Sequence, residues 1–232
     1  GYRWIKFDPF GYSPDGVWKG WPLRGALPSE TVREICSRVA AVRDAVGGQM
    51  QIILENHCLT DAQSAVTLIR ALEGYHIDYY EEVCTPINHA VWADVRKHTD
   101  AGLCTGEKLV TQSGFLPYIV GRTVDMLQPD LGICGGVSEI MPICAMAELY
   151  DIGVSLHTCH SPISIAASLQ VEAVLPNFCV HEVHKSALLE ENIALGSEPL
   201  CVKNGKYTLP EGNGIGVELS DWALRNCERL VF

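Results

Sequence analysis

The sequence predicts an α/β fold in which a parallel (β/α) barrel of the TIM type takes up most of the chain. Short apolar runs alternate with helix-length amphipathic segments seven times, which is typical of parallel strands joined by crossover helices. An acidic residue or a histidine follows six of these runs at intervals of 23 to 27 residues, the length of one strand and helix. A doubly wound sheet would instead gather its chemistry beside a glycine-rich phosphate loop, and the sequence contains no GxGxxG or Walker-type motif.

The predicted elements follow one another along the chain. The strands are predicted at residues 4–7, 51–54, a run ending at 79–80, then 102–105, 124–127, 153–156 and 178–180. The helices are predicted at residues 29–46, a segment beginning at Thr60, then 88–98, 115–120, 137–150 and 162–174. Gly47-Gly48 ends the first helix, and Thr60 with Gln63 has the spacing of a capping box.

The pattern changes after the seventh strand. Residues 1–199 are predicted to form the barrel, and residues 200–232 a C-terminal hairpin and helix that pack on the barrel or on a capping region. Lys203-Asn204-Gly205-Lys206 has the composition of a type I′ hairpin turn. Ser220 is the predicted cap of a closing helix that extends to about Arg229.

Composition restricts the class of protein. The chain has 232 residues, enough for one large domain, and 47% of them are hydrophobic. Its formal net charge of −11 argues against a nucleic-acid surface, and no apolar run is long enough to span a membrane. Ten cysteines without a CxxC pair indicate reduced thiols in a cytoplasmic protein. Because the chain opens within a strand, and with Gly rather than Met, we expect a fragment of a longer polypeptide.

Three consecutive predicted strands end in carboxylates, those of Glu55, Glu81 and Glu107. Carboxylates that converge after apolar residues repel one another unless a cation lies between them. Ligands that are all oxygen favour a hard ion, so we expect one Mg²⁺ per site. The alternative is that these glutamates form structural salt bridges with Lys108 and with arginines.

Asp130 and His157 end neighbouring predicted strands, and an aspartate that orients a histidine makes a general base. His160 lies close by in the sequence and is the alternative to His157. His57 follows Glu55 by two residues and is a second candidate acid or base. Lys6 ends the first strand, where it either neutralises a substrate carboxylate or is a surface lysine.

Four motifs resemble the enolase superfamily, and specifically its mandelate racemase branch. These are Tyr80-Glu81-Glu82 with Pro86 for "EEP", Gly106-Glu107-Lys108 for "GER", Gln128-Pro129-Asp130-Leu131 with Gly135-Gly136 for "QPD…GG", and His157 with Pro162-Ile163 for "H…GPI". The similarity covers nearly the whole chain. It implies the enolase-like C-terminal barrel, with Lys6 on the second of eight strands, so that strands 2–8 are present. The first strand and the N-terminal capping domain are then expected to be missing.

The resemblance also implies roles for the site residues. It makes Glu55, Glu81 and Glu107 the metal ligands, His157 and Asp130 the basic dyad, and Glu182 the acid that contacts substrate from the last strand. Glu55 departs from the usual aspartate, Lys108 from the usual arginine and Val83 from the usual proline. The racemases carry Lys-x-Lys where this chain has Lys6-Phe7-Asp8, and without the second lysine racemisation is disfavoured.

Lys6-Phe7-Asp8-Pro9-Phe10 and Glu55-x-His57 are instead similar to the acid sugar dehydratases, such as galactonate dehydratase. The implied enzyme is a Mg²⁺-dependent hydro-lyase that converts a small sugar acid to a 2-keto-3-deoxy acid, with His57 or His157 protonating the leaving hydroxyl. An epimerase or cycloisomerase on the same scaffold is one alternative. A barrel that has lost catalysis and has a structural or interaction role is another. We also expect a homo-oligomer.

Overall fold

The computed structural model describes residues 1–13, 15–18, 20, 25–159 and 161–228 and contains one parallel sheet of six strands. The strands are β1 (Trp4–Phe7), β2 (Gln51–Glu55), β3 (Tyr79–Glu81), β4 (Leu103–Thr105), β5 (Met126–Leu127) and β6 (Gly153–Val154). Each strand pairs with the next one along the chain, so the order is β1-β2-β3-β4-β5-β6. A doubly wound sheet would reverse its order at a switch point, and this sheet does not.

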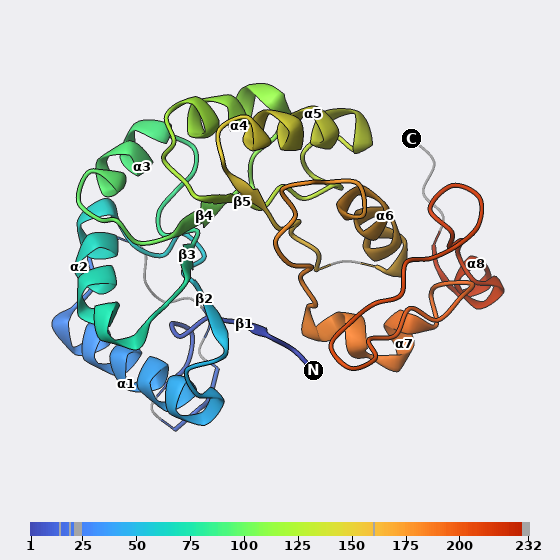
Figure 1. Cartoon of the computed structure of the whole chain (residues 1–232). Helices are drawn as coiled ribbons and strands as arrows, with labels where there is room; N and C mark the ends of the chain where they lie inside the picture. Colours follow the sequence, from blue (N-terminus) through green and yellow to red (C-terminus); the bar gives the residue numbers. More distant parts are fainter. Residues whose placement is uncertain (14, 19, 21–24, 160, 229–232) are drawn as a thin grey trace.

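Helices connect the strands and follow the last of them. They are α1 (Ser29–Val46), α2 (Ala62–Leu72), the 3₁₀ turn η1 (Glu73–Tyr75), α3 (His89–Arg96), α4 (Thr111–Val120), α5 (Val137–Glu148), α6 (Pro162–Glu172), the 3₁₀ turn η2 (Lys185–Leu188), α7 (Glu190–Ile193) and α8 (Asp221–Asn226). Helices α1 to α5 lie on the convex side of the curled sheet (Figure 1). Sequential parallel strands with their crossover helices outside form part of a TIM-type barrel, which confirms the predicted fold class.

The predicted strand at 178–180 is wrong. Phe178 makes a single parallel bridge with Val154, and the amide of Cys179 donates to the Val154 carbonyl at 2.8 Å. A strand in a parallel barrel is buried on both faces, whereas Phe178 is 39% exposed. The segment therefore runs beside β6 without continuing the ladder.

The predicted cap at Thr60 is also wrong. Asp61 is the N-cap of α2, and its carboxylate accepts the Ser64 amide at 2.7 Å. The Thr60 hydroxyl donates instead to the carbonyl of Val83, so it joins the segment after β2 to the segment after β3. A threonine hydroxyl can cap a helix or bond to a more distant backbone group, and here it bonds to the more distant carbonyl.

The predicted turn and closing helix are both present in the C-terminal segment. Asn204 and Gly205 have φ values of 52° and 72° between bridged Lys203 and Lys206, as a type I′ turn requires. Ser220 caps α8 by accepting the Ala223 amide at 3.1 Å, and the helix ends at Asn226, while Arg229 lies outside the described residues.

Three clusters of buried side chains stabilise the described structure. One consists of Ile53, Cys104 and Met126 on β2, β4 and β5, and the other two differ in size. The larger one fills the space between the sheet and helices α1 to α5 and includes Trp92, Phe115 and Tyr118. The smaller one joins α6 to the C-terminal segment through Ile165, Ala166, Ala187, Leu200 and Val217. The C-terminal segment therefore packs on α6.

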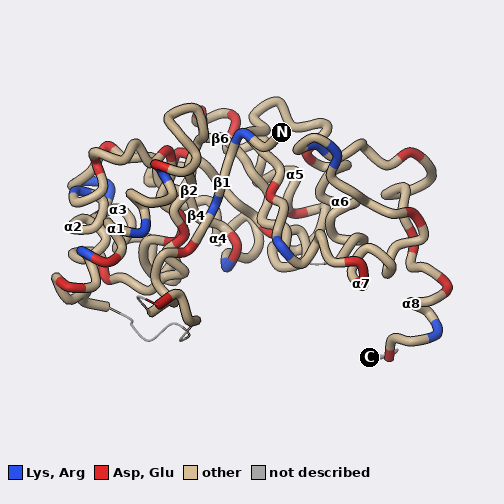
Figure 2. Tube along the Cα trace, turned by 90° about the horizontal axis from the view of Figure 1, so that it is seen from below, with Lys and Arg blue, Asp and Glu red and all other residues tan. Residues whose placement is uncertain are grey.

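Charges of both signs are interspersed along the described chain (Figure 2). Within that part of the chain, no helix is both long enough and apolar enough to cross a bilayer. All ten cysteines lie in the described part, and each is a thiol.

Phe115 and Leu116 on α4 provide a matched test of the packing. Phe115 is fully buried, whereas its neighbour Leu116 is 45% exposed. Phe115→Ala is expected to lower the free energy of unfolding by about 3–5 kcal/mol, because it leaves a cavity in the main core. Leu116→Ala is expected to change it by no more than about 0.5 kcal/mol. Denaturant titration followed by circular dichroism measures both, and equal losses would contradict the packing described here.

Candidate metal centre and acid/base site

Glu55, Glu81 and Glu107 lie together where three neighbouring strands end. Glu55 and Glu81 close β2 and β3 and are register partners, and Glu107 follows β4 by two residues. One carboxylate oxygen from each lies within 4.8 Å of those of the other two. Parallel strands bring their carboxyl ends to the same edge of the sheet, which is why residues 26 positions apart meet here.

Gly106 lets the third glutamate reach this position. Its φ is 152°, and a Cβ there would lie 2.6 Å from the backbone carbonyl carbon of Gln128. Any larger residue would push the loop after β4 away from β5. Gln128 also contacts the cluster with its side chain, whose amide donates to Glu81 Oε2 at 2.5 Å.

Lys6 on β1 faces the same cluster. Its Nζ lies 2.6 Å from Glu81 Oε1, 2.6 Å from Glu182 Oε1 and 3.8 Å from Glu55 Oε2. Burial alone would lower the pKa of Lys6, but the charges of these glutamates raise it well above its ordinary value. Lys6 is therefore a charged site residue, and not the surface lysine of the alternative prediction.

Glu107 is paired with Lys108, which also lies 2.9 Å from Glu82 Oε2. Burial opposes ionisation of Glu107, but the hydrogen bond from Lys108 keeps its pKa below the usual value. Glu82 is fully buried and also accepts from the Cys58 thiol at 2.7 Å and from the Thr105 hydroxyl. This buried network fixes Lys108, and through it the orientation of Glu107.

The donor set fits a hard divalent cation. All three groups are carboxylates, and the neighbouring ammonium of Lys6 is shared among Glu55, Glu81 and Glu182. Burial raises the pKa of Glu55 well above its usual value, and the charge of Glu81 raises it further. A cation bound by these oxygens would offset that repulsion. The salt bridges that the alternative prediction expected with Lys108 are present, but only Glu107 of the three takes part in them.

Asp130 and His157 form a hydrogen-bonded pair beside the glutamates. The two residues are bridge partners, and His157 Nδ1 lies 2.7 Å from Asp130 Oδ2. His157 Nε2 lies 3.6 Å from Glu107 Oε2, so this nitrogen faces the cluster. Burial opposes protonation of His157, but the bond to Asp130 and the charge of Glu182 raise its pKa above the ordinary value. His160 lies outside the described residues.

His57 lies near the same carboxylates, after β2. It has a left-handed backbone, with φ of 47°, and its amide donates to Glu55 Oε1 at 2.6 Å. Its Nδ1 lies 2.8 Å from Asp8 Oδ2. Glu182 faces Lys6 and accepts the Thr158 amide at Oε2 at 2.9 Å. The structure therefore brings all eight predicted site residues into one region. Their chemical roles stay predictions.

Sequence reasoning missed three residues that support the site. In the sequence, Asp8 stands in place of the racemases' second lysine and within a dehydratase-like motif, while Gln128 and Glu82 belong to other motifs. The position of Asp8, directly after the first strand and beside the strand that carries His57, is a pattern that could have identified it. Glu82 and Gln128 follow strands whose neighbours carry the other site residues, but their hydrogen bonds depend on side-chain directions that a sequence does not specify.

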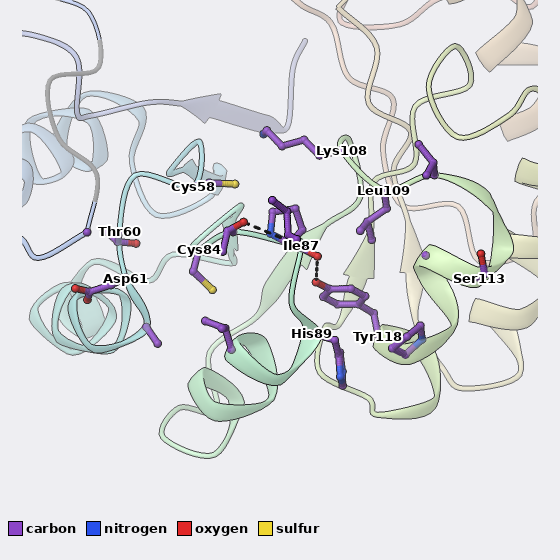
Figure 3. A pocket seen from close by; sticks show the side chains of 18 residues that line it. Cys58, Thr60, Asp61, Cys84, Ile87, His89, Lys108, Leu109, Ser113 and Tyr118 are labelled. Atoms are coloured by element: carbon purple, nitrogen blue, oxygen red, sulfur yellow. Dashed lines mark hydrogen bonds between the residues drawn. The ribbon is translucent and has the colours of Figure 1, made fainter.

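A separate cavity of about 880 Å³ lies outside the glutamate cluster (Figure 3). Cys58, Cys84, Leu109 and Tyr118 are among the residues that line it. The Tyr118 hydroxyl donates to the carbonyl of Pro86 at 2.7 Å across one wall. None of the three clustered glutamates lines this cavity, but Lys108, which pairs with Glu107, does.

Comparison of the sequence with known proteins identifies the family of this chain. A family profile described as "Enolase C-terminal domain-like" matches residues 1–223. A D-gluconate dehydratase of Thermoproteus tenax is 33% identical over 227 residues, covering 97% of this chain and 43% of that protein. A D-galactarolactone cycloisomerase of Agrobacterium fabrum is 32% identical over 208 residues, covering 83% of this chain and 53% of that protein. The chain thus spans about half the length of these relatives.

A solved structure of a member of the enolase superfamily from Salmonella Typhimurium superposes with a TM-score of 0.93 at 38% sequence identity. The superposition covers 97% of this chain and 58% of that one. The range matched by the family profile, residues 1–223, includes all six strands of the described sheet.

Glu107→Gln is expected to weaken Mg²⁺ binding by about 10-fold or more, because it removes one charged oxygen ligand of three. Isothermal titration calorimetry at constant pH measures the dissociation constant. The control is Glu211→Gln, which changes an exposed glutamate in the C-terminal segment and is expected to leave the constant unchanged. Equal affinity of the wild type and Glu107→Gln would show that the cluster is not the metal site.

Proposed function

The chain belongs to the enolase C-terminal domain-like family, and from this premise we propose that it forms the catalytic barrel of a Mg²⁺-dependent acid sugar dehydratase. The observation that carries the proposal is the Asp130–His157 pair, whose Nε2 faces the three-glutamate cluster at 3.6 Å from Glu107. A relative named D-gluconate dehydratase supports the class of substrate. The proposed substrate is therefore a sugar acid with a hydroxyl group on the carbon next to the α-carbon.

Glu55, Glu81 and Glu107 would hold the metal ion, which when bound supplies positive charge that makes the α-proton of a carboxylate more acidic. His157 accepts the α-proton at Nε2, because Asp130 engages Nδ1 and sets the tautomer of the ring. Lys6 and Glu182 lie beside the cluster, where the ammonium favours the negative charge that builds up on the substrate carboxylate. Glu182 is in position to hydrogen-bond a substrate oxygen.

Elimination also needs an acid, because hydroxide is a poor leaving group. As the β-carbon–oxygen bond breaks, His57 delivers a proton to that oxygen, which departs as water. The electron pair of the α-carbon–hydrogen bond becomes the new carbon–carbon double bond. The resulting enol takes up a proton at the β-carbon, loses its hydroxyl proton to solvent and becomes the 2-keto-3-deoxy acid. His157 has gained one proton and His57 has lost one, and exchange with solvent restores both.

One observation favours a second candidate function. A relative at 32% identity is named a D-galactarolactone cycloisomerase, and cycloisomerisation needs the same α-proton chemistry without loss of water. The two functions differ in their products. A 2-keto acid, detected as its semicarbazone, supports dehydration of D-gluconate or a related aldonate. Consumption of D-galactarolactone without a 2-keto product supports cycloisomerisation.

His157→Asn is expected to lower kcat for dehydration by about 10²- to 10⁴-fold, because the base that removes the α-proton is lost. The control is His98→Asn, which changes an exposed histidine two residues after the end of α3 and is expected to leave kcat unchanged. Semicarbazide assays of 2-keto acid formation measure both variants. Full activity in His157→Asn would rule out this residue as the base.

Removal of divalent metal with EDTA is expected to abolish dehydration, and excess Mg²⁺ is expected to restore it, because the α-proton of a carboxylate is too weakly acidic without a cation. The thermal midpoint, followed by circular dichroism, shows whether the protein stays folded during the treatment. Activity that survives EDTA in the folded protein would contradict the proposal.

A further inference from the structure

Contacts with Phe10 and His57 hold Asp8 in one orientation. Its Oδ1 accepts the amide of Phe10, two residues along the chain, at 2.6 Å. Its Oδ2 lies 2.8 Å from Nδ1 of His57. The side chain of Asp8 is 12% exposed, and Arg38 donates to the carbonyl of Pro9 within the same turn. The hydrogen bond from Phe10 therefore orients the Asp8 carboxylate toward His57.

The same arrangement occurs at the basic dyad. Asp130 Oδ1 accepts the amide of Gly132, also two residues along the chain, at 2.7 Å, and its Oδ2 lies 2.7 Å from Nδ1 of His157. In both pairs the aspartate follows one strand and the histidine follows the next, β1 and β2 in one case, β5 and β6 in the other. The two pairs thus lie at opposite ends of the described sheet, and Glu81 and Glu107 lie between them, at the ends of β3 and β4.

We propose that Asp8 is a positioning residue for His57 and that the two form a second aspartate–histidine dyad, on the acid side of the site. This inference rests on the proposed dehydration. By accepting the Nδ1 hydrogen, Asp8 sets the ring orientation, so that the second proton of the doubly protonated ring is carried by Nε2. Nε2 gives this proton to the β-hydroxyl oxygen of a sugar acid, and His57 is left neutral with its hydrogen on Nδ1. The Asp130–His157 pair removes the α-proton, and the Asp8–His57 pair protonates the leaving oxygen.

Asp8→Asn separates this role from a purely structural one. The variant has nearly the same shape, and its carbonyl oxygen can keep the hydrogen bond from the Phe10 amide. Its NH₂ group then faces His57 Nδ1, which must become an acceptor and so lose its hydrogen. The substitution therefore preserves the turn and favours the other neutral tautomer, in which Nε2 carries the hydrogen. It also disfavours the doubly protonated ring, which is the form that can give a proton to the leaving oxygen.

The experiment measures three quantities in the wild type, Asp8→Asn, Asp130→Asn and the surface control Asp151→Asn. They are the tautomer of neutral His57, from long-range ¹⁵N–¹H NMR with His57→Asn as the assignment reference, the dehydration rate, and the rate at which D₂O exchanges the substrate α-proton. In Asp8→Asn we expect the His57 hydrogen to move from Nδ1 to Nε2 and kcat for dehydration to fall by about 100-fold. Exchange of the α-proton is expected to continue.

Asp130→Asn is expected to slow both exchange and dehydration, and Asp151→Asn neither. An unchanged His57 tautomer or unchanged dehydration in Asp8→Asn would overturn the inference, as would an equal loss of exchange and dehydration with a lowered thermal midpoint, which would mark Asp8 as structural. If the wild type dehydrates no sugar acid, the proposed function fails, and the NMR spectra still report whether Asp8 sets the tautomer of His57.

Discussion

The site depends on the repulsion between three carboxylates that the fold holds side by side. Glu55 and Glu81 are almost completely buried, and their oxygens and one of Glu107 lie within 4.8 Å of one another. In such surroundings water screens charge poorly, so compensation must come from fixed groups or from a bound cation. Lys6, Lys108 and the amide of Gln128 each neutralise or hydrogen-bond part of the cluster. The remaining negative charge favours a divalent ion.

The backbone maintains this arrangement at a cost. His57, Cys58 and Glu82 have positive φ values, and each left-handed residue other than glycine costs about 1–2 kcal/mol. The Cys58 amide donates to the Glu82 carbonyl at 2.7 Å, and the Glu82 amide donates to the Cys104 carbonyl at 3.0 Å. These bonds link the ends of β2, β3 and β4 into one unit. The strained turns are thus the means by which the glutamates and His57 face a common centre.

The barrel and the ring of site residues could be predicted because both depend on a repeat of strand and helix, and this repeat is visible in the sequence. Side-chain direction and tertiary competition do not follow from periodicity. Thr60 has the spacing of a helix cap, but it bonds to the carbonyl of Val83, and Asp61 caps α2. Residues 178–180 have the composition of a strand, but their pairing with β6 in the described structure is an isolated bridge between Phe178 and Val154. Asp8 shows its role only through its contacts with Phe10 and His57.

The central claim is that the three glutamates together bind one divalent ion. Its most direct test is anomalous diffraction from crystals of the protein soaked in Mn²⁺, a stand-in for Mg²⁺ with a strong anomalous signal. We expect a single peak in contact with an oxygen of each of Glu55, Glu81 and Glu107. A peak at another place, or none at this cluster when Mn²⁺ is saturating, would contradict it.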